Sequence, residues 1–181
     1  IIRERFSKDE IVLRVDANGA FSLDEAPSKL DALAAFDIHS IEQPLQARQW
    51  EAMATLCNNT PIPIALDEEL IGVFDTCQKQ ALLDEIKPQY IILKPSFIGG
   101  FRGSQDWIDL ANAGKIGWWV TSALESNVGL NAITQWTYTL NPKGPQGLGT
   151  GSLYTNNIDS PLLVENGYIS YDKTRNWYTI Q

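Results

Sequence analysis

The chain has 181 residues, of which 44% are hydrophobic and 20% are charged, as in ordinary globular proteins. Its net charge of −8 argues against a nucleic-acid partner, because phosphate binding needs a basic surface. No apolar run is long enough to cross a membrane and no stretch resembles a signal peptide, so we expect a cytoplasmic protein without a membrane partner.

Strand-like and helical segments alternate along the chain with a nearly constant period. Runs rich in β-branched residues predict strands, and apolar residues at helical spacing predict the helices between them. The expected strands are 10–15, 39–43, 62–67, 90–94 and 117–123, and the expected helices are 23–36, 47–58, 74–85, 104–113 and 128–138. A short strand is expected near Gly147, and an irregular tail after residue 151. This alternation predicts an α/β fold with a parallel sheet.

Two cysteines, Cys57 and Cys77, lie within the helical patterns and lack a Cys-x-x-Cys spacing. We predict that both are reduced and buried. The chain opens at Ile1 and its only methionine is Met53, so we expect it to be part of a longer protein.

Four successive strand ends carry a charged residue: Asp16, Glu42, Asp67 and Lys94, which are 26, 25 and 27 residues apart. One strand, one helix and two loops need about that length. The carboxyl ends of parallel strands share one edge, which favours a closed barrel over an open doubly wound sheet. We count about six strand–helix units where such a barrel has eight, and we expect the missing strands before Ile1.

The three carboxylates form a hard, all-oxygen ligand set. Such a set suits Mg²⁺ or Mn²⁺ and argues against zinc, and three ligands leave positions open for substrate oxygens. The alternative is that each acid caps a helix or pairs with a surface lysine.

Lys94 follows the apolar run 91–93. Partial desolvation beside a metal ion lowers a lysine pKa and suits it to proton transfer or to stabilising a developing negative charge. The alternative is a structural ion pair with Asp67 or Glu68.

Side chains alternate along a strand, so Arg14, Asp16 and Asn18 face the same way. Arg14 either anchors a substrate carboxylate or neutralises nearby acids. Asn18 either orients a metal ligand or substrate, or serves as a turn residue. The only histidine, His39, starts a strand at the opposite end, so a Ser-His-Asp or Cys-His site is excluded within this chain.

At these strand ends the sequence resembles the enolase superfamily, and within it the muconate-lactonizing subgroup and its o-succinylbenzoate synthase family. The stretches that carry the resemblance are 13–19, 41–45, 65–68, 93–95 with 99–100, 121–126 and 147–151.

The resemblance implies a modified (β/α)7β barrel, of which residues 1–181 are the C-terminal portion. It implies that Asp16, Glu42 and Asp67 hold one Mg²⁺, which stabilises an enediolate, and that Lys94 is catalytic. It implies that Arg14 contacts a carboxylate of a small substrate and that Ser122, Glu125 and the loop of Gly149 shape the distal substrate pocket. Asn18, from its place beyond Asp16, is the further predicted substrate-binding residue. The implied activity is that of a hydro-lyase of menaquinone biosynthesis.

The sequence departs from the family pattern in two respects. It contains no Lys-x-Lys motif, which supplies a second catalytic lysine in the family, and no N-terminal capping domain. We expect both upstream of Ile1, so that this fragment alone is inactive. Racemisation of N-succinylamino acids, dipeptide epimerisation and a non-catalytic metal-binding module are the alternatives, although the stretch 147–151 lacks the Asp-x-Asp of dipeptide epimerases.

Overall fold

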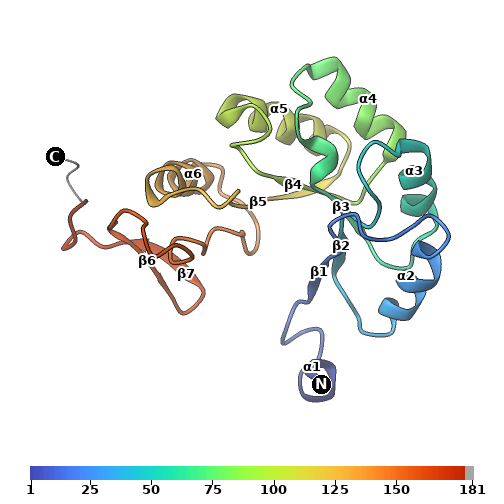
Figure 1. Cartoon of the computed structure of the whole chain (residues 1–181), viewed down its shortest axis with the longest axis horizontal. Helices are drawn as coiled ribbons and strands as arrows, with labels where there is room; N and C mark the ends of the chain where they lie inside the picture. Colours follow the sequence, from blue (N-terminus) through green and yellow to red (C-terminus); the bar gives the residue numbers. More distant parts are fainter. Residues whose placement is uncertain (178–181) are drawn as a thin grey trace. The chain divides into compact units, whose positions relative to one another are not determined.

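A computed structural model describes residues 1–177 of the chain (Figure 1). Five strands form one sheet in the order β1-β2-β3-β4-β5. Their bounds are β1 Arg14–Asp16, β2 Ser40–Glu42, β3 Ile64–Leu66, β4 Tyr90–Leu93 and β5 Gly117–Val120. The pairs β1–β2, β2–β3 and β3–β4 are all parallel, as the alternation of strands and helices predicts.

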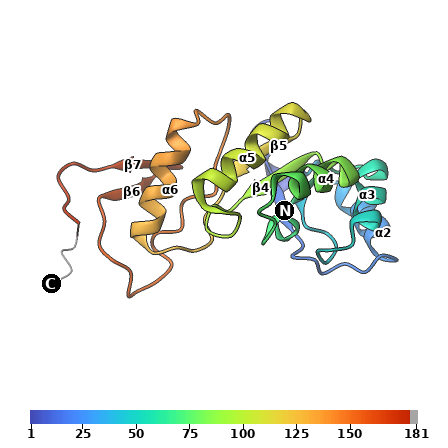
Figure 2. The same cartoon turned by 90° about the horizontal axis from the view of Figure 1, so that it is seen from above.

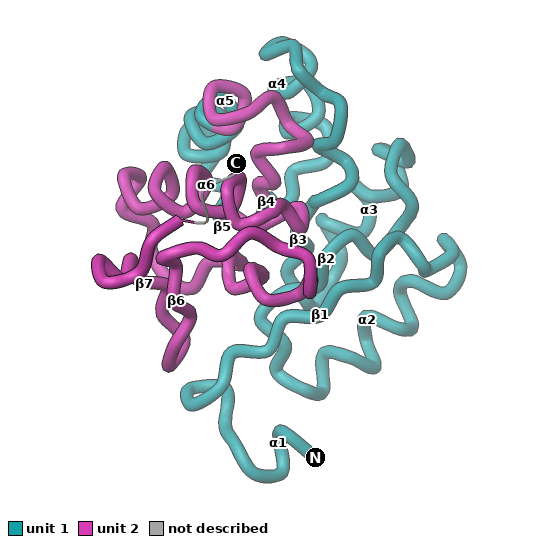
Figure 3. The backbone as a smooth tube through the Cα atoms, turned by 60° about the vertical axis from the view of Figure 1, so that its left-hand side comes forward, with its two compact units in different colours: residues 1–92, 105–118 teal, residues 93–104, 119–181 magenta. Residues whose placement is uncertain are grey.

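The chain divides into two compact units (Figure 3). Unit 1 comprises residues 1–92 and 105–118, and unit 2 comprises residues 93–104 and 119–181, of which 178–181 lie outside the described residues. The acidic strand ends belong to unit 1, whereas Lys94, Ser122, Glu125 and Gly149 belong to unit 2.

In unit 1 the helices α2, α3 and α4 lie on the outer side of strands β1 to β3 (Figure 1). The helices that begin in this unit are α1 Ile2–Arg5, α2 Ala26–Ala34, α3 Trp50–Asn59, the 3₁₀ turn η1 Glu68–Leu70 and α4 Thr76–Ile86. Each of α2, α3 and α4 buries one apolar stripe, represented by Leu30, Met53 and Leu82. The strands supply the other side of this core, with Ile41, Ile64 and Ile91 nearly inaccessible.

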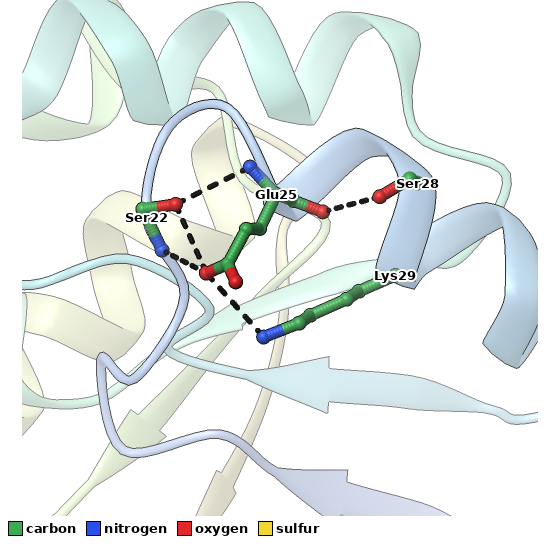
Figure 4. Close-up of polar contacts among 4 residues, drawn as sticks. All are labelled: Ser22, Glu25, Ser28 and Lys29. Atoms are coloured by element: carbon green, nitrogen blue, oxygen red, sulfur yellow. Dashed lines mark hydrogen bonds and ion pairs between the residues drawn. The ribbon is translucent and has the colours of Figure 1, made fainter.

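A capping box of Ser22 and Glu25 closes the turn that leads into α2 (Figure 4). The Ser22 hydroxyl donates to Glu25 Oε2 at 2.9 Å, and the backbone N–H groups of Ser22 and Glu25 donate to each other's side chains at 3.3 Å. Lys29 lies one turn later, with its Nζ 3.4 Å from the same carboxylate oxygen. These contacts satisfy backbone donors that a helix start leaves free, and they hold the pKa of Glu25 below its usual value through the bonds from Ser22.

Most predicted elements are present, with shifted ends. The first strand begins at Arg14 rather than at residue 10. Helix α5, Gly100–Ala113, begins four residues before the predicted start at Ser104. The Ser104 hydroxyl donates to the Gly100 carbonyl at 2.8 Å inside that first turn.

Unit 2 corrects the prediction of an irregular tail after residue 151. Strands β6 Leu162–Glu165 and β7 Tyr168–Tyr171 form an antiparallel hairpin, whose strands lie side by side in Figure 2. Asn166 and Gly167 connect them with φ of 52° and 80°, which is the positive-φ pair of a type I′ turn. The other helix of this unit is α6, Asn127–Thr139. The strand predicted near Gly147 is present only as a single parallel bridge between Gly147 and Thr121.

The two cysteines differ, which makes one prediction wrong. Cys57 is a buried free thiol on α3, as predicted, but Cys77 is exposed. Cys77 stands in the first turn of α4, on the side that does not face the core. Within residues 1–177, no helix has the length and apolar character needed to cross a membrane.

Candidate active site

Three carboxylates stand at the carboxyl ends of neighbouring strands in unit 1. Asp16 ends β1, Glu42 ends β2, and Asp67 directly follows β3. Asp16 and Glu42 are register partners, and Glu42 pairs with Ala65, two residues before Asp67. Side chains at paired positions of parallel strands leave the sheet on the same side, and so do residues two apart on one strand. The register therefore directs all three acids to one side of the sheet, as the sequence predicts.

The three acids become progressively more buried from β1 to β3. Asp16 is exposed, Glu42 is half-buried and Asp67 is 2% exposed. Asp16 Oδ1 accepts the backbone N–H of Asn18 at 2.8 Å, and Asn18 has φ of 46°. Asn18 thus forms the turn after β1 and orients the Asp16 carboxylate through its main chain. A contact of its side chain with substrate stays a prediction.

The donor set fits a hard divalent cation by its chemistry, because all three groups are carboxylates. However, residues 1–177 contain no group of three or more His, Cys, Asp or Glu side chains arranged to hold a metal ion. The strand register thus places the three acids on one side of the sheet, but their side chains do not form a metal-binding cluster among the described residues. Their convergence on one ion stays a prediction.

Arg14 lies on the same side of β1 as Asp16, since the exposed residues 14 and 16 alternate with the half-buried Val15. Desolvation lowers the pKa of Arg14 from its usual value, against a smaller opposite effect of Tyr90. A guanidinium stays charged at neutral pH despite such a shift, so Arg14 retains the charge needed to bind a carboxylate.

A buried polar network, which the sequence did not reveal, links the ends of β2 and β3. Gln43 and Glu69 are both 0% exposed, and the Gln43 amide donates to Glu69 Oε2 at 3.2 Å. The Gln43 side-chain oxygen accepts the backbone N–H of Asp67 at 3.2 Å and of Glu69 at 3.3 Å. Gln43 adjoins Glu42 in the sequence, and this adjacency to a predicted ligand is the only signal that the sequence offered.

In unit 2, Lys94 is half-buried and directly follows β4. Its loop ends at Gly99 and Gly100, both with positive φ, of 99° and 67°. The predicted positions of Lys94 and the loop at a strand end are therefore confirmed. Its place opposite the three acids, which belong to unit 1, stays a prediction.

Ser122 and Glu125 tie together the loops of unit 2. The Ser122 hydroxyl accepts the backbone N–H of Leu124 at 2.8 Å and a hydrogen bond from Thr150 Oγ1 at 2.7 Å. Glu125 accepts the backbone N–H of Ala123 at 2.9 Å and the hydroxyl of Ser96, two residues after Lys94. Both side chains thus stabilise the conformation of their own loops. Their contacts with substrate stay a prediction.

The three glycines of the stretch 147–151 have different surroundings. A Cβ at Gly147 would lie 2.4 Å from Thr121 Oγ1, and one at Gly151 would lie 2.6 Å from Asn127 Oδ1. A Cβ at Gly149 would meet only Val164 Cγ1, at an ordinary 3.7 Å. Packing within unit 2 therefore excludes a Cβ at Gly147, which would also lie 2.9 Å from Thr121 Cβ, whereas a Cβ at Gly151 would require the Asn127 side chain to move. Gly149 is unconstrained, and its role in substrate binding stays a prediction.

The comparison with protein families matches the enolase C-terminal domain-like family over residues 1–174. The chain belongs to this family. The o-succinylbenzoate synthase of Desulfotalea psychrophila is 58% identical over 168 residues, which cover 93% of this chain and 45% of that protein. The N-succinylamino acid racemase of Amycolatopsis sp. is 30% identical over 172 residues, with the same shares of 93% and 45%. The chain thus spans less than half the length of these relatives.

Solved structures give the same result. The crystal structure of MenC from Desulfotalea psychrophila LSv54 has a TM-score of 0.90 and 58% identity, covering 93% of this chain and 47% of that one. A muconate cycloisomerase variant has a TM-score of 0.82 at 24% identity, which shows likeness of fold alone. Together these findings confirm the predicted fold class, the C-terminal portion of an α/β barrel of the enolase superfamily.

Proposed function

We propose that the natural full-length protein is an o-succinylbenzoate synthase. It would dehydrate 2-succinyl-6-hydroxy-2,4-cyclohexadiene-1-carboxylate in menaquinone biosynthesis, in the cytoplasm. The observation that carries this proposal is the 58% identity to a synthase over 93% of the chain. The placement of Asp16, Glu42 and Asp67 at successive parallel strand ends supports it.

In this proposal Asp16, Glu42 and Asp67 would hold the Mg²⁺ ion, with Mn²⁺ as a substitute. When bound, the ion supplies Lewis-acid stabilisation of the negative charge that develops on the substrate carboxylate. Asp67 is almost completely buried, so water would screen the attraction between its carboxylate and the ion very little.

The elimination breaks one C–H bond and one C–O bond and forms a C=C bond. A base removes the α-proton, the electron pair forms the new double bond, and the 6-hydroxyl leaves with a proton as water. Lys94 would stabilise the negative charge between these events with its ammonium group. The base itself would be the second lysine of the family, which we expect upstream of this chain.

Arg14 would bind a carboxylate of the substrate with its guanidinium fork. The loops that carry Ser122, Glu125 and Gly149 would shape the pocket around the succinyl chain. The side chain of Asn18 would contact the substrate, while its main chain forms the observed turn at Asp16. No nucleic acid is proposed as a partner, given the net charge of −8.

Racemisation of N-succinylamino acids is the second candidate, favoured by the 30% identity to a racemase over the same 93% of the chain. It needs the same acids and lysines, but after removal of the α-proton a proton is delivered to the opposite face of the α-carbon, and no water is lost. The dipeptide epimerase and the non-catalytic module are the remaining alternatives.

The test is an assay of the natural full-length protein with Mg²⁺ and with EDTA. Loss of the cyclohexadiene chromophore that depends on Mg²⁺ supports the synthase, and loss of optical rotation of an N-succinylamino acid alone supports the racemase. Absence of both activities with Mg²⁺ present overturns the proposal and leaves the dipeptide epimerase and the non-catalytic module, which an assay with a dipeptide substrate separates. Residues 1–181 by themselves should show neither activity.

A further inference from the structure

The Gln43 side chain makes four hydrogen bonds, which use its whole capacity. Its oxygen accepts the N–H groups of Asp67 and Glu69, at 3.2 and 3.3 Å. Its amide nitrogen donates to the Leu45 carbonyl at 3.0 Å and to Glu69 Oε2 at 3.2 Å. Two donors thus face the oxygen and two acceptors face the nitrogen, which fixes the orientation of the amide. All five groups belong to unit 1.

The backbone at Gln43 is bent to make this possible. Gln43 has φ of 34°, a backbone conformation that residues other than glycine rarely adopt and that costs about 1–3 kcal/mol where it occurs. The bend comes immediately after Glu42, and Gln43 still donates its own N–H to the Ala65 carbonyl at 2.9 Å. The strained residue is therefore held from both its main chain and its side chain.

Glu69 completes the network. Its second oxygen, Oε1, accepts the backbone N–H of Arg48 at 2.7 Å, in the segment that leads from β2 to α3. A 0% exposed carboxylate needs such bonds, because burying an unsatisfied charge costs several kcal/mol. Through Gln43 and Glu69, the turn after β2 and the turn after β3 form one hydrogen-bonded body.

We propose that Gln43 and Glu69 are positioning residues for the metal-binding acids. Gln43 directly follows Glu42 and binds the N–H of Asp67, so it fixes the spacing between two of the three expected ligands. In this proposal Gln43 acts through the two acids and contacts neither substrate nor metal itself. The inference rests on the proposed function, because it presupposes that Glu42 and Asp67 bind the ion.

The test measures Mn²⁺ affinity of the natural full-length protein by electron paramagnetic resonance of the free ion. Gln43→Met keeps the length of the side chain and removes all four bonds. We expect the Mn²⁺ dissociation constant to rise about 10–100-fold, as when groups behind metal ligands are removed. Glu69→Gln removes the charge with little change of shape and should weaken binding in the same direction, by less. It carries the test if Gln43→Met does not fold.

Gln89 offers a matched control. It also bridges strand β3 to a neighbour, accepting the Ile64 N–H at 2.9 Å and donating to the Cys57 carbonyl at 3.1 Å, but at the opposite end of the strand. Gln89→Met should lower the melting temperature as Gln43→Met does, and should leave Mn²⁺ affinity within about twofold, because sites without shared partners act independently.

The outcomes separate the two proposals. Failure of the unaltered protein to bind Mn²⁺ overturns the proposed function, and this inference with it. Normal Mn²⁺ binding by Gln43→Met and Glu69→Gln overturns the positioning role alone. Equal weakening by Gln43→Met and Gln89→Met also overturns it, because the effect would then reflect general stability.

Discussion

Asp16 on β1 and Glu42 on β2 are register partners in neighbouring parallel strands. Strands in a sheet lie about 4.8 Å apart, so two like charges at paired positions repel each other unless a cation lies between them. A pair of acids at this register position therefore weakens the sheet where it stands and favours a bound divalent ion.

Neutralising either acid should strongly weaken ion binding. For Asp16→Asn and for Glu42→Gln in the full-length protein, we expect Mn²⁺ affinity to fall by at least about 100-fold, the upper range for groups that only support a ligand. Asp24→Asn, in the exposed turn before α2, is the control and should bind Mn²⁺ normally. Unchanged affinity in both variants would exclude these acids as ligands.

Lys94 is expected to act on the substrate and not on the ion. Lys94→Met should lower kcat by roughly 10²–10⁴-fold, the usual contribution of a group that moves protons or stabilises charge. Mn²⁺ affinity should stay within a few-fold, unlike in the acid variants. Lys143→Met, on an exposed loop of the same unit, provides the control. A purely structural Lys94 would instead lower stability at unchanged kcat.

The acidic strand ends were predictable from the sequence because each depends on local order: a buried run, a charged residue and a turn. The network of Gln43 and Glu69 was not, because it joins residues 26 apart through side-chain bonds that no local pattern encodes. The hairpin β6–β7 was missed for another reason. Its Asn166-Gly167 turn is a strong local signal, but neither strand beside that turn contains a fully buried residue, so no buried apolar run marks them.

His39 should make stability depend on pH. It is half-buried, with its ring centroid 5.0 Å from that of Tyr90. Burial, and secondarily the charge of Arg14, lowers its pKa below the ordinary 6.5. The unfolded chain then binds the proton more readily than the folded one, so stability is complete above about pH 6.5 and falls as the pH drops toward the lower folded value.

The measurement is urea unfolding at several pH values for the unaltered protein and for His39→Gln. The free energy of unfolding of the unaltered protein minus that of His39→Gln should decrease below pH 6.5, because only the unaltered protein carries this histidine. The contributions of the carboxylates are the same in both proteins and cancel in the difference. Parallel curves throughout would show that His39 contributes nothing to this dependence.

The two thiols should react at very different rates. Burial raises the pKa of Cys57 to about 12, so that at pH 8 only about one thiol in 10⁴ is ionised. Cys77 is exposed on α4. Iodoacetamide should therefore modify one cysteine quickly in the folded protein and both in guanidinium. Cys77→Ser should remove the fast reaction and Cys57→Ala should retain it; rapid double labelling of the folded protein would contradict this expectation.

The ion pair between α4 and α5 should respond differently to loss of each partner. Lys79 is 0% exposed, its Nζ lies 3.2 Å from Asp106 Oδ2, and the same Nζ lies 5.6 Å from the centre of the Trp107 ring. Asp106→Asn removes a counter-charge from a buried ammonium and should lower the free energy of unfolding by about 1–3 kcal/mol. Lys79→Met removes the buried charge itself while keeping the apolar stem, so it should cost less than about 1 kcal/mol or stabilise the protein.

Urea unfolding of both variants tests this order, with Asp109→Asn on the exposed side of α5 as the control. That control should change stability by no more than about 0.5 kcal/mol, as surface substitutions do. A larger loss for Lys79→Met than for Asp106→Asn would mean that the ammonium contributes more through its charge than it costs to bury, and that Lys79 is held mainly by electrostatic contacts and not by packing of its stem.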